Sequence, residues 1–536
     1  MALWELKKMQ SRTSDKRSSK IITILCLTLI LAAEAFADVK LPAVISNNMV
    51  LQQGIKVPIW GWAKPGEVIM VRFAGQVKYA KADTSGKWSV RFDELKAAKK
   101  RAGMLMTISG LNTIEIKNVL VGEVWVCSGQ SNMQMTMAKT ETCWYGGVMN
   151  AEREIAAANY PNIRLFTVEQ KTTEQPQSDC KGEWLQCSPQ TVSNFGAAAY
   201  FFGRQLHNEL NVPIGLINTS WGATPIEAWM SREVLKSDAN FEPIFKRYAD
   251  DVAKYPQAEK EYDQKMKEWE EADAKAKTEN KPSPEKPPSP HGPGHKSSPA
   301  GLYNAMVSPL MPYAIKGVIW YQGEANRSRA YQYRKLFAAM IKNWRDKWGQ
   351  GDFPFYYVQI APFKYNKEAE LIAAELREAQ LMTLSVPNTG MAVTIDIGDA
   401  NNIHPKNKQE AGRRLALWAL AKTYGRKLAY CGPIYKSMKL DGNKIILHFD
   451  YAENGLVCKD EMLKGFTIAG ADEKFVPAEA EIVGDTIAVS CKEIANPVAV
   501  RYGWANNPLC NLYNKEGLPA SPFRTDCRPG VTINEK

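Results

Sequence analysis

One stretch, Val119 to Met137, constrains the fold of this 536-residue chain more than any other. Its first nine residues, VLVGEVWVC, are apolar and rich in β-branched side chains, which is typical of a strand covered on both faces. Small, turn-forming residues and a Met-rich run that can begin a helix follow. Ligands of open α/β sheets bind beyond the carboxyl ends of the strands. Ser131 therefore lies where chemistry is common in such folds, although a serine before a helix is also an ordinary N-cap.

Beyond this stretch, strand-like and helix-like patterns alternate. The strand candidates are residues 163–168, 214–219, 316–321, 355–361 and 391–396. The helical patterns between and after them are residues 196–211, 331–348, 367–385 and 407–423. Alternation of this kind predicts a mostly parallel sheet wrapped by helices, so residues 119–430 are interpreted as one α/β domain.

Residues 38–118 show a different pattern, in which short strand-like runs are bounded by turn residues and no helical pattern lies between them. This pattern predicts an N-terminal β-sandwich. Trp60, Trp62 and Trp88 could form a sugar-stacking face there, but alternating aromatic residues more often fill a sandwich core.

Two further segments depart from the α/β pattern. Residues 238–299 hold a Glu/Lys/Ala-rich helix and a Pro-rich tract, which we interpret as a surface insertion. His291 and His295 lie in that tract without the other ligands that a metal site needs. Residues 431–536 return to strand patterns and predict a C-terminal β domain.

The first 37 residues have the pattern of a secretory signal peptide. Six basic side chains precede an apolar run from Ile21 to Ala33, and Ala35-Phe36-Ala37 supplies small residues for cleavage. We therefore expect an exported protein, periplasmic or extracellular, with no membrane span after cleavage, since no later run reaches membrane-spanning length.

The charge distribution argues against a nucleic-acid-binding protein, and the cysteine content leaves disulfides possible after export. The formal net charge is +11, and the basic side chains are not clustered as they are in nucleic-acid binders. After export, Cys180 with Cys187, Cys458 with Cys491 and Cys510 with Cys527 could pair, whereas Cys127 reads as a free core thiol.

If Ser131 is a nucleophile, it needs a base, which is usually histidine. Of five histidines, His404 follows the strand that ends at Asp396 and precedes a helix, so it lies at the same sheet edge as Ser131. Two other loops at this edge offer hydrogen-bond donors for an oxyanion: Gly222 follows residues 214–219, and Asn326 follows residues 316–321. Met133 breaks the G-x-S-x-G elbow, which disfavours an α/β-hydrolase.

These blocks resemble the SGNH hydrolases, and specifically the sialate O-acetylesterase-like family. The matching stretches cover nearly all of the expected mature chain: LPAVISNNMVLQQ, VWVCSGQSNM, NVPIGLINTSWGATPIEAWM, LYNAMVSPL, IKGVIWYQGEAN and IHPKNKQEAGRRLA. The resemblance implies a flavodoxin-like parallel-sheet catalytic domain and a serine esterase that removes O-acetyl groups from sugars.

The resemblance also implies roles for individual residues. Ser131 would be the nucleophile and His404 the base. The oxyanion donors would be the Ser131 backbone, Gly222 and Asn326. Further candidates for substrate contact are Gln130, Arg377 and Gln380. No metal or cofactor is implied, and the expected partner is an O-acetylated glycan rather than nucleic acid.

The third catalytic member is left open. Many SGNH enzymes carry an aspartate shortly before the histidine, but Asn401 and Asn402 occupy those positions here. Either amide could orient His404. The carboxylates that could do so instead are Asp396, Asp399 and Glu324.

Two other functions compete with sialate deacetylation. An acetyl xylan or other hemicellulose esterase could share the scaffold, and a non-catalytic carbohydrate-binding protein would need neither Ser131 nor His404.

Overall fold

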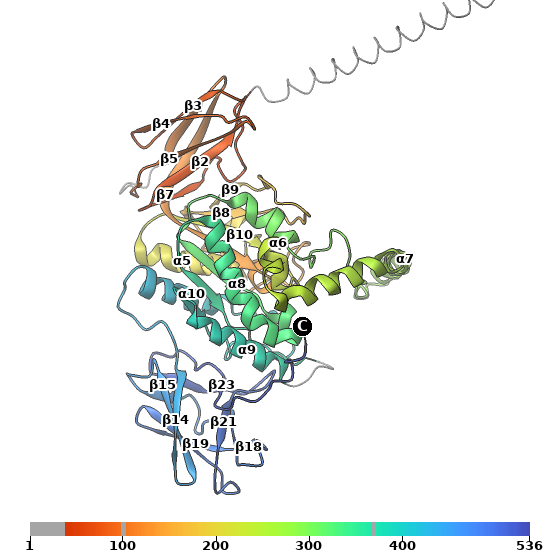
Figure 1. Cartoon of the computed structure of the whole chain (residues 1–536), viewed down its shortest axis with the longest axis vertical. Helices are drawn as coiled ribbons and strands as arrows, with labels where there is room; N and C mark the ends of the chain where they lie inside the picture. Colours follow the sequence, from red (N-terminus) through yellow and green to blue (C-terminus); the bar gives the residue numbers. More distant parts are fainter. Residues whose placement is uncertain (1–37, 98–102, 366–370, 536) are drawn as a thin grey trace, which may run out of the picture.

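The computed structural model describes residues 38–97, 103–365 and 371–535. The expected signal peptide, residues 1–37, lies outside the described residues. Three parts are stacked along the long axis of the molecule: an N-terminal β part, a central α/β body and a C-terminal β part (Figure 1). Within the described ranges, no helix is long and apolar enough to cross a membrane.

Strand β7 (Thr113–Gly129) joins the first two parts as one continuous element. Residues 113–118 are mostly exposed or half-buried, whereas every residue from Val119 to Gly129 is buried. Asn118, at the junction, has a positive φ of 58°. The boundary that we predicted between 118 and 119 thus lies inside one strand, because neither glycine nor proline separates the two strand-like runs.

The N-terminal part consists of two small sheets and one strand that joins the central body. Strands β2 and β5 pair antiparallel, and β4, β3, β6 and the start of β7 form a second antiparallel sheet. The short β1 pairs in parallel with residues 120–122 of β7. The bounds are β1 Val50–Gln52, β2 Val57–Trp62, β3 Val68–Phe73, β4 Gln76–Lys81, β5 Lys87–Phe92 and β6 Met104–Ser109.

The central sheet has the order β13-β12-β11-β7-β10-β8-β9, and all its pairs are parallel except β8 with β9. Its other strands are β8 Tyr160–Thr167, β9 Trp184–Cys187, β10 Ile214–Ser220, β11 Gly317–Tyr321, β12 Phe355–Val358 and β13 Thr389–Ala392. The predicted mostly parallel sheet is therefore confirmed. In the middle of the sheet, β10 and β11 pair with β7 on either side, and β8 pairs in parallel with the outer side of β10.

Helices cover both faces of this sheet (Figure 1). On one face α8 (Ala330–Trp348) and α9 (Ile372–Met382) pack in the core that includes Trp320 and Tyr357. On the other face α5 (Ala197–Leu210) and α10 (Lys408–Trp418) pack in the core that includes Trp125 and Tyr356. The shorter helices are α2 Ser131–Gln134, α3 Ala151–Ala156, α4 Pro189–Val192 and α6 Arg232–Lys236.

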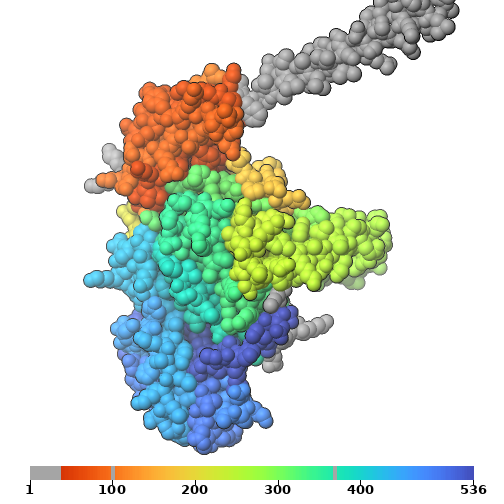
Figure 2. All heavy atoms as spheres, in the orientation of Figure 1, coloured from red at the N-terminus to blue at the C-terminus, as the bar shows by residue number. Residues whose placement is uncertain are grey.

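The insertion begins as α7 (Glu242–Thr278), which projects from the central body (Figures 1 and 2). The Pro-rich residues 281–299 that follow contain only turns, bends and unclassified backbone. The returning end of the insertion comes back to the base of α7, where His291 Nδ1 lies 3.6 Å from Asp251.

The C-terminal part contains two four-stranded sheets, a two-stranded pair and a core of its own. Its strands are β14 Ile434–Asp441, β15 Lys444–Asp450, β16 Leu456–Cys458, β17 Phe466–Ala469, β18 Val476–Pro477, β19 Glu479–Val483, β20 Thr486–Ser490, β21 Ala499–Tyr502, β22 Leu512–Asn514 and β23 Phe523–Arg524.

All nine cysteines in the described ranges are free thiols, so none of the three candidate disulfides is formed. Cys180 packs against the core on one face of the central sheet, and Cys187 lies in the core on the other face. This separation explains why Cys180 and Cys187 do not pair. Cys127 is buried in the central sheet, as expected for a core thiol.

Candidate active site

Ser131 lies directly beyond the carboxyl end of β7, where it begins the short helix α2. Gly129 allows this turn, because its φ is 138° and a Cβ there would lie 2.2 Å from the Tyr321 carbonyl oxygen of β11. Ser131 is 8% exposed, so it is largely buried at this edge of the sheet. β10 and β11 flank β7, so the strand that follows on one side and the strand that follows on the other diverge at the end of β7. Open α/β sheets bind ligands at such a topological switch point, and Ser131 lies there.

Gly222 and Tyr145 lie beside the serine. A Cβ on Gly222 would be 3.2 Å from Ser131 Cβ and 3.1 Å from Tyr145 Oη. The Gly222 N–H donates to Gln134 Oε1 (2.7 Å), which also accepts from Tyr145 Oη (2.8 Å). The predicted oxyanion donor is thus next to Ser131, but in this structure its hydrogen is held by Gln134.

His404 lies in the loop between β13 and α10. Its ring stacks on Tyr145, with centroids 4.3 Å apart and planes at 17°, and Trp144 approaches it edge-on at 6.4 Å. Burial, together with the positive charge of Lys408, lowers the pKa of His404 to about 4. The imidazole is therefore neutral at pH 7, which is the form that can accept a proton.

Asn132, the residue after Ser131, connects the nucleophile loop to the histidine loop. Its Nδ2 donates to Glu324 Oε1 (2.8 Å) and to the Ile403 carbonyl oxygen (3.1 Å). Its Oδ1 accepts from Lys408 Nζ (2.8 Å). One buried amide thus holds the loop after β11, the loop before His404 and the start of α10.

Lys408 and Glu324 are the charged ends of this buried chain. Lys408 Nζ also donates to the Pro405 carbonyl oxygen at 2.6 Å, directly after His404. Burial lowers the pKa of Lys408 to about 7, against the opposing effect of Glu324. Burial raises the pKa of Glu324, against its hydrogen bonds and the charge of Lys408.

None of the five residues predicted to orient His404 bonds to its ring in this structure. Asn402 Oδ1 accepts from the backbone N–H of His404 (2.9 Å), so it shapes the loop and does not bind the imidazole. Asp399 Oδ1 accepts from the Asn401 N–H (2.9 Å). Neither Asn402 nor Asn401 contacts the imidazole in this structure, so the predicted orienting contact stays a prediction.

The remaining two carboxylates are committed elsewhere. Asp396 binds Arg414 through both oxygens, at 2.6 and 2.8 Å, and accepts from Tyr513 at 3.3 Å. Glu324 reaches the site only through Asn132. In the described ranges, the His404 ring is thus held by aromatic packing and by its loop, without a carboxylate partner.

Asn326 is not placed as an oxyanion donor. Its side chain is inaccessible to solvent, its Nδ2 donates to Glu227 (2.8 Å), and its Oδ1 accepts from the Ile226 N–H (2.9 Å) and Gln322 (2.7 Å). An oxyanion donor must be reachable by the substrate. In this structure Asn326 links the loops after β10 and β11, and its role as an oxyanion donor stays a prediction.

Arg377 and Gln380 are also structural. Both are fully buried on α9. Arg377 donates to the carbonyl oxygens of Ala505 (2.8 Å) and Asn506 (2.8 Å), which fastens the C-terminal part to the central body. Gln380 bonds to the backbone at the ends of β11 and β12. Neither side chain reaches a surface in this structure, so the predicted substrate contacts have no support from its geometry.

Gln130 has a role in building the site. Its Oε1 accepts from the N–H groups of Gly323 (3.2 Å) and Ala325 (3.3 Å), so it shapes the loop after β11. A substrate contact through its amide nitrogen stays a prediction.

Sequence reasoning missed three residues of the site: Asn132, Tyr145 and Lys408. Asn132 and Lys408 are inside the family-like blocks GQSNM and IHPKNKQEAG, so their position next to Ser131 and His404 was an available signal. Tyr145 lies in the segment CWYGG, where nothing in a single sequence marks it.

A cavity of about 620 Å³ adjoins the catalytic loops. Ala223 and Ala325, from the loops after β10 and β11, line one side, and the insertion lines the other. Glu227 Oε1 lies 2.9 Å from Arg329 and 3.7 Å from Arg247, so one carboxylate faces two guanidinium groups. Arg329 Nε is buried without a hydrogen-bond acceptor among the described residues.

The described ranges contain no group of three or more His, Cys, Asp and Glu side chains arranged to hold a metal ion. His291 and His295 stack on each other beside the cavity, with ring centroids 4.3 Å apart.

Known proteins resemble this chain over nearly its whole length. A family model described as carbohydrate esterase, sialic acid-specific acetylesterase, matches residues 121–277 and 295–421. Sialate O-acetylesterases from Pongo abelii and Homo sapiens are each 33% identical to it, over 95% of this chain and 98% of the relative. A crystal structure of a carbohydrate acetylesterase from Xanthomonas citri is 36% identical, with a TM-score of 0.77, over 92% of this chain and 100% of that one.

Together these similarities define a carboxylic ester hydrolase that acts on acetylated sugars. The chain belongs to the family of sialic acid-specific acetylesterases among the carbohydrate esterases.

Proposed function

We propose that this enzyme is a serine esterase that removes O-acetyl groups from sialic acids, with Ser131 as nucleophile and His404 as base. One observation carries the serine assignment. Ser131, at the sheet's switch point, adjoins Gly222 and Tyr145, and Tyr145 stacks on His404.

The chemistry follows from these groups. Ser131 Oγ attacks the acetyl carbonyl carbon while His404 takes the hydroxyl proton. The Ser131 N–H has no acceptor among the described residues, so it is available to the oxyanion. Gly222 becomes a second donor once the substrate displaces Gln134 Oε1. The intermediate collapses as His404 returns the proton to the sugar oxygen, and water then releases acetate from the acetyl-serine.

His404 works here without a bound carboxylate. The stacked Tyr145 and the anchored loop fix the orientation of the imidazole. A neutral partner does not stabilise the imidazolium that forms during attack as a carboxylate would. The buried Lys408 opposes that charge further, so the base is a weak one with a low pKa.

This pKa makes a prediction about pH. The neutral, active form of His404 exists above its pKa, so kcat/KM for 4-nitrophenyl acetate should fall on acidification only near pH 4, well below the ordinary histidine value. Lys408→Met removes a positive neighbour and should move this acid limb to higher pH. Initial rates between pH 3.5 and 8, with circular dichroism at each pH, measure both effects. An acid limb near pH 6.5 in the wild type, or one that moves down in Lys408→Met, would contradict the assignment.

The cavity beside the catalytic loops supports an anionic sugar. Arg247 and Arg329 both face the carboxylate of Glu227, so two guanidinium groups lie in the cavity lining with Ala223 and Ala325. A guanidinium binds a carboxylate with two parallel hydrogen bonds. The carboxylate of a sialic acid would satisfy this pair while its acetyl group lies at Ser131.

Arg247→Met tests the substrate assignment. Since a hydrogen bond to a charged group contributes about 1.5–3 kcal/mol, kcat/KM for O-acetylated sialic acid should fall roughly 10- to 100-fold. The rate on acetylated xylobiose, which is neutral, should not change. Arg72→Met, which removes an exposed arginine of β3, is the matched control.

The same comparison separates the competing esterase. Wild-type enzyme that prefers acetylated xylobiose, with an Arg247→Met variant that treats both substrates alike, would favour a hemicellulose esterase and overturn the sialate proposal.

A further inference from the structure

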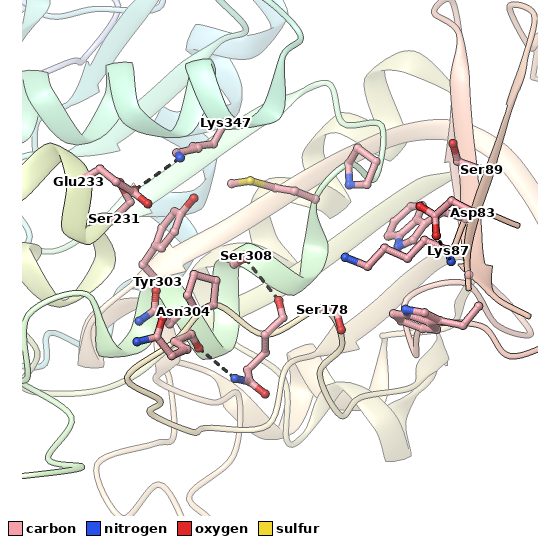
Figure 3. A pocket seen from close by; sticks show the side chains of 18 of the residues that line it. Asp83, Lys87, Ser89, Ser178, Ser231, Glu233, Tyr303, Asn304, Ser308 and Lys347 are labelled. Carbon is pink, nitrogen blue, oxygen red and sulfur yellow. Dashed lines mark hydrogen bonds and ion pairs between the residues drawn. The ribbon is translucent and has the colours of Figure 1, made fainter. Parts of the chain in front are cut away.

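A cleft of about 1030 Å³ lies away from Ser131, between the N-terminal strands and the central body (Figure 3). The strands β2, β4 and β5 contribute one wall, which includes Lys87 and Ser89. Helix α6, the end of α8 and residues 303–312 contribute much of the opposite wall, which includes Glu233 and Lys347.

This cleft is at the other edge of the central sheet. Helix α8 starts after β11 ends and runs back roughly 28 Å to the start of β12, so Lys347 marks the amino edge of the sheet. Ser131 and His404 follow carboxyl ends of strands. No residue of the candidate active site lines the cleft.

Two indole rings face the cleft from one strand. Trp60 and Trp62 are two residues apart on β2, so they share a face with their β5 partners Ser89 and Lys87. Both indoles are half-buried, and neither N–H donates to an acceptor among the described residues. Trp88 also lines the cleft but is 3% exposed and belongs to the core, and Trp60 packs edge-on against Tyr313 at the border of that core.

The charge of the cleft is predominantly positive. Lys81, Lys87 and Lys236 line it, and none of them is within ion-pair distance of a described carboxylate, although the charge of Lys87 adds to the hydrogen bonds that lower the pKa of Asp83. Two of the acidic residues in the lining are already occupied. Glu233 lies 3.4 Å from Lys347, and Asp83 Oδ1 accepts from the backbone N–H groups of Ser85 and Lys87 within its own turn.

We propose that this cleft is a second carbohydrate-binding site, for an oligosaccharide that carries carboxylate groups. Indole rings give flat apolar surfaces for the C–H faces of sugar rings, and their N–H groups bind hydroxyl oxygens. The unpaired ammonium groups bind the carboxylates. The volume exceeds that of a typical small-ligand pocket, so it holds more than one sugar ring. The site retains the enzyme on an acidic glycan and is independent of the proposed catalytic mechanism.

Calorimetric titration with hexagalacturonate, with neutral xylohexaose as the comparison, tests this proposal. The full chain is first blocked at the nucleophile with an organophosphonate, and Ser131→Ala serves in its place if the reagent does not react. Hexagalacturonate should bind, and xylohexaose should bind at least tenfold more weakly. Trp62→Ala and Lys87→Glu should each weaken hexagalacturonate binding at least tenfold.

Two exposed residues of the same part serve as controls outside the cleft. Tyr79→Ala removes an aromatic ring and Lys56→Glu reverses a charge, and neither should change the affinity. Lys87 is exposed, so Lys87→Glu should fold normally. If Trp62→Ala misfolds, the binding affinity of Lys87→Glu still tests the proposal. Absence of binding, equal affinity for xylohexaose, or equal weakening by Lys56→Glu and Lys87→Glu would each overturn the proposal.

Discussion

Ser131→Ala and His404→Ala are each expected to lower kcat for acetyl ester hydrolysis by on the order of 10⁶, and the double variant should lose little more. The reason is that nucleophile and base act in one step, so the loss of either removes the whole covalent route. The measurement is steady-state hydrolysis of 4-nitrophenyl acetate by purified variants.

The fold should survive both substitutions. Ser131 Oγ and the His404 ring make no hydrogen bond within the described ranges, so their removal leaves no buried partner unsatisfied. Circular dichroism and thermal unfolding should match the wild type. A folded Ser131→Ala protein with near-normal kcat would exclude the serine mechanism.

Asn132→Ala is expected to lower kcat by roughly 10²-fold, the scale of a misplacement by about 1 Å. The amide holds Glu324, Lys408 and the Ile403 carbonyl together, so its loss frees the histidine loop from the nucleophile loop. Stability should also fall, because two buried charged groups lose a partner, each at a cost of about 1–3 kcal/mol.

A buried asparagine elsewhere separates these two effects. Asn343 on α8 bonds to Ser231 through both its oxygen and its nitrogen and is equally buried. Asn343→Ala should lose stability and keep kcat. If Asn132→Ala behaves in the same way, the bridge between the two loops has no catalytic role.

The order of strands and helices in the central body could be predicted from residue patterns. Its central strands are buried on both faces, so they appear as apolar runs separated by turn residues. Four of the five strand candidates after β7 appear close to their predicted bounds, and the helix predicted from 407 is present as α10. The fifth candidate, residues 391–396, overlaps β13 (Thr389–Ala392) by only two residues. That β7 continues through Asn118 as one strand could not be predicted from the sequence. Its half-exposed first part and its fully buried second part have different residue patterns, which suggest two separate strands.

Within the site, the sequence predicted which loops lie at the edge of the sheet better than it predicted which side chains of those loops point toward the substrate. Ser131, Gly222 and His404 meet because carboxyl ends of parallel strands share one edge. The resemblance also marked Asn326, Arg377 and Gln380 as site residues, but their side chains point into the protein and bond to backbone. A pattern of residues cannot distinguish a polar side chain that binds substrate from one that satisfies buried backbone groups.

The orientation of His404 shows the same limit. The residues ANNIHP suggest an amide on the imidazole, whereas the Asn402 oxygen is used by the backbone N–H two residues on. The aromatic support from Tyr145 comes from a segment far away in the sequence.

The most direct test of the central claim is to identify the residue that is acylated. The enzyme is treated with a fluorophosphonate that mimics the tetrahedral intermediate, digested, and mapped by mass spectrometry. The label should be on Ser131, should be absent from Ser131→Ala, and should form more slowly in His404→Ala. Modification of another residue, or rapid inactivation of Ser131→Ala, would contradict the assignment of Ser131 as the nucleophile.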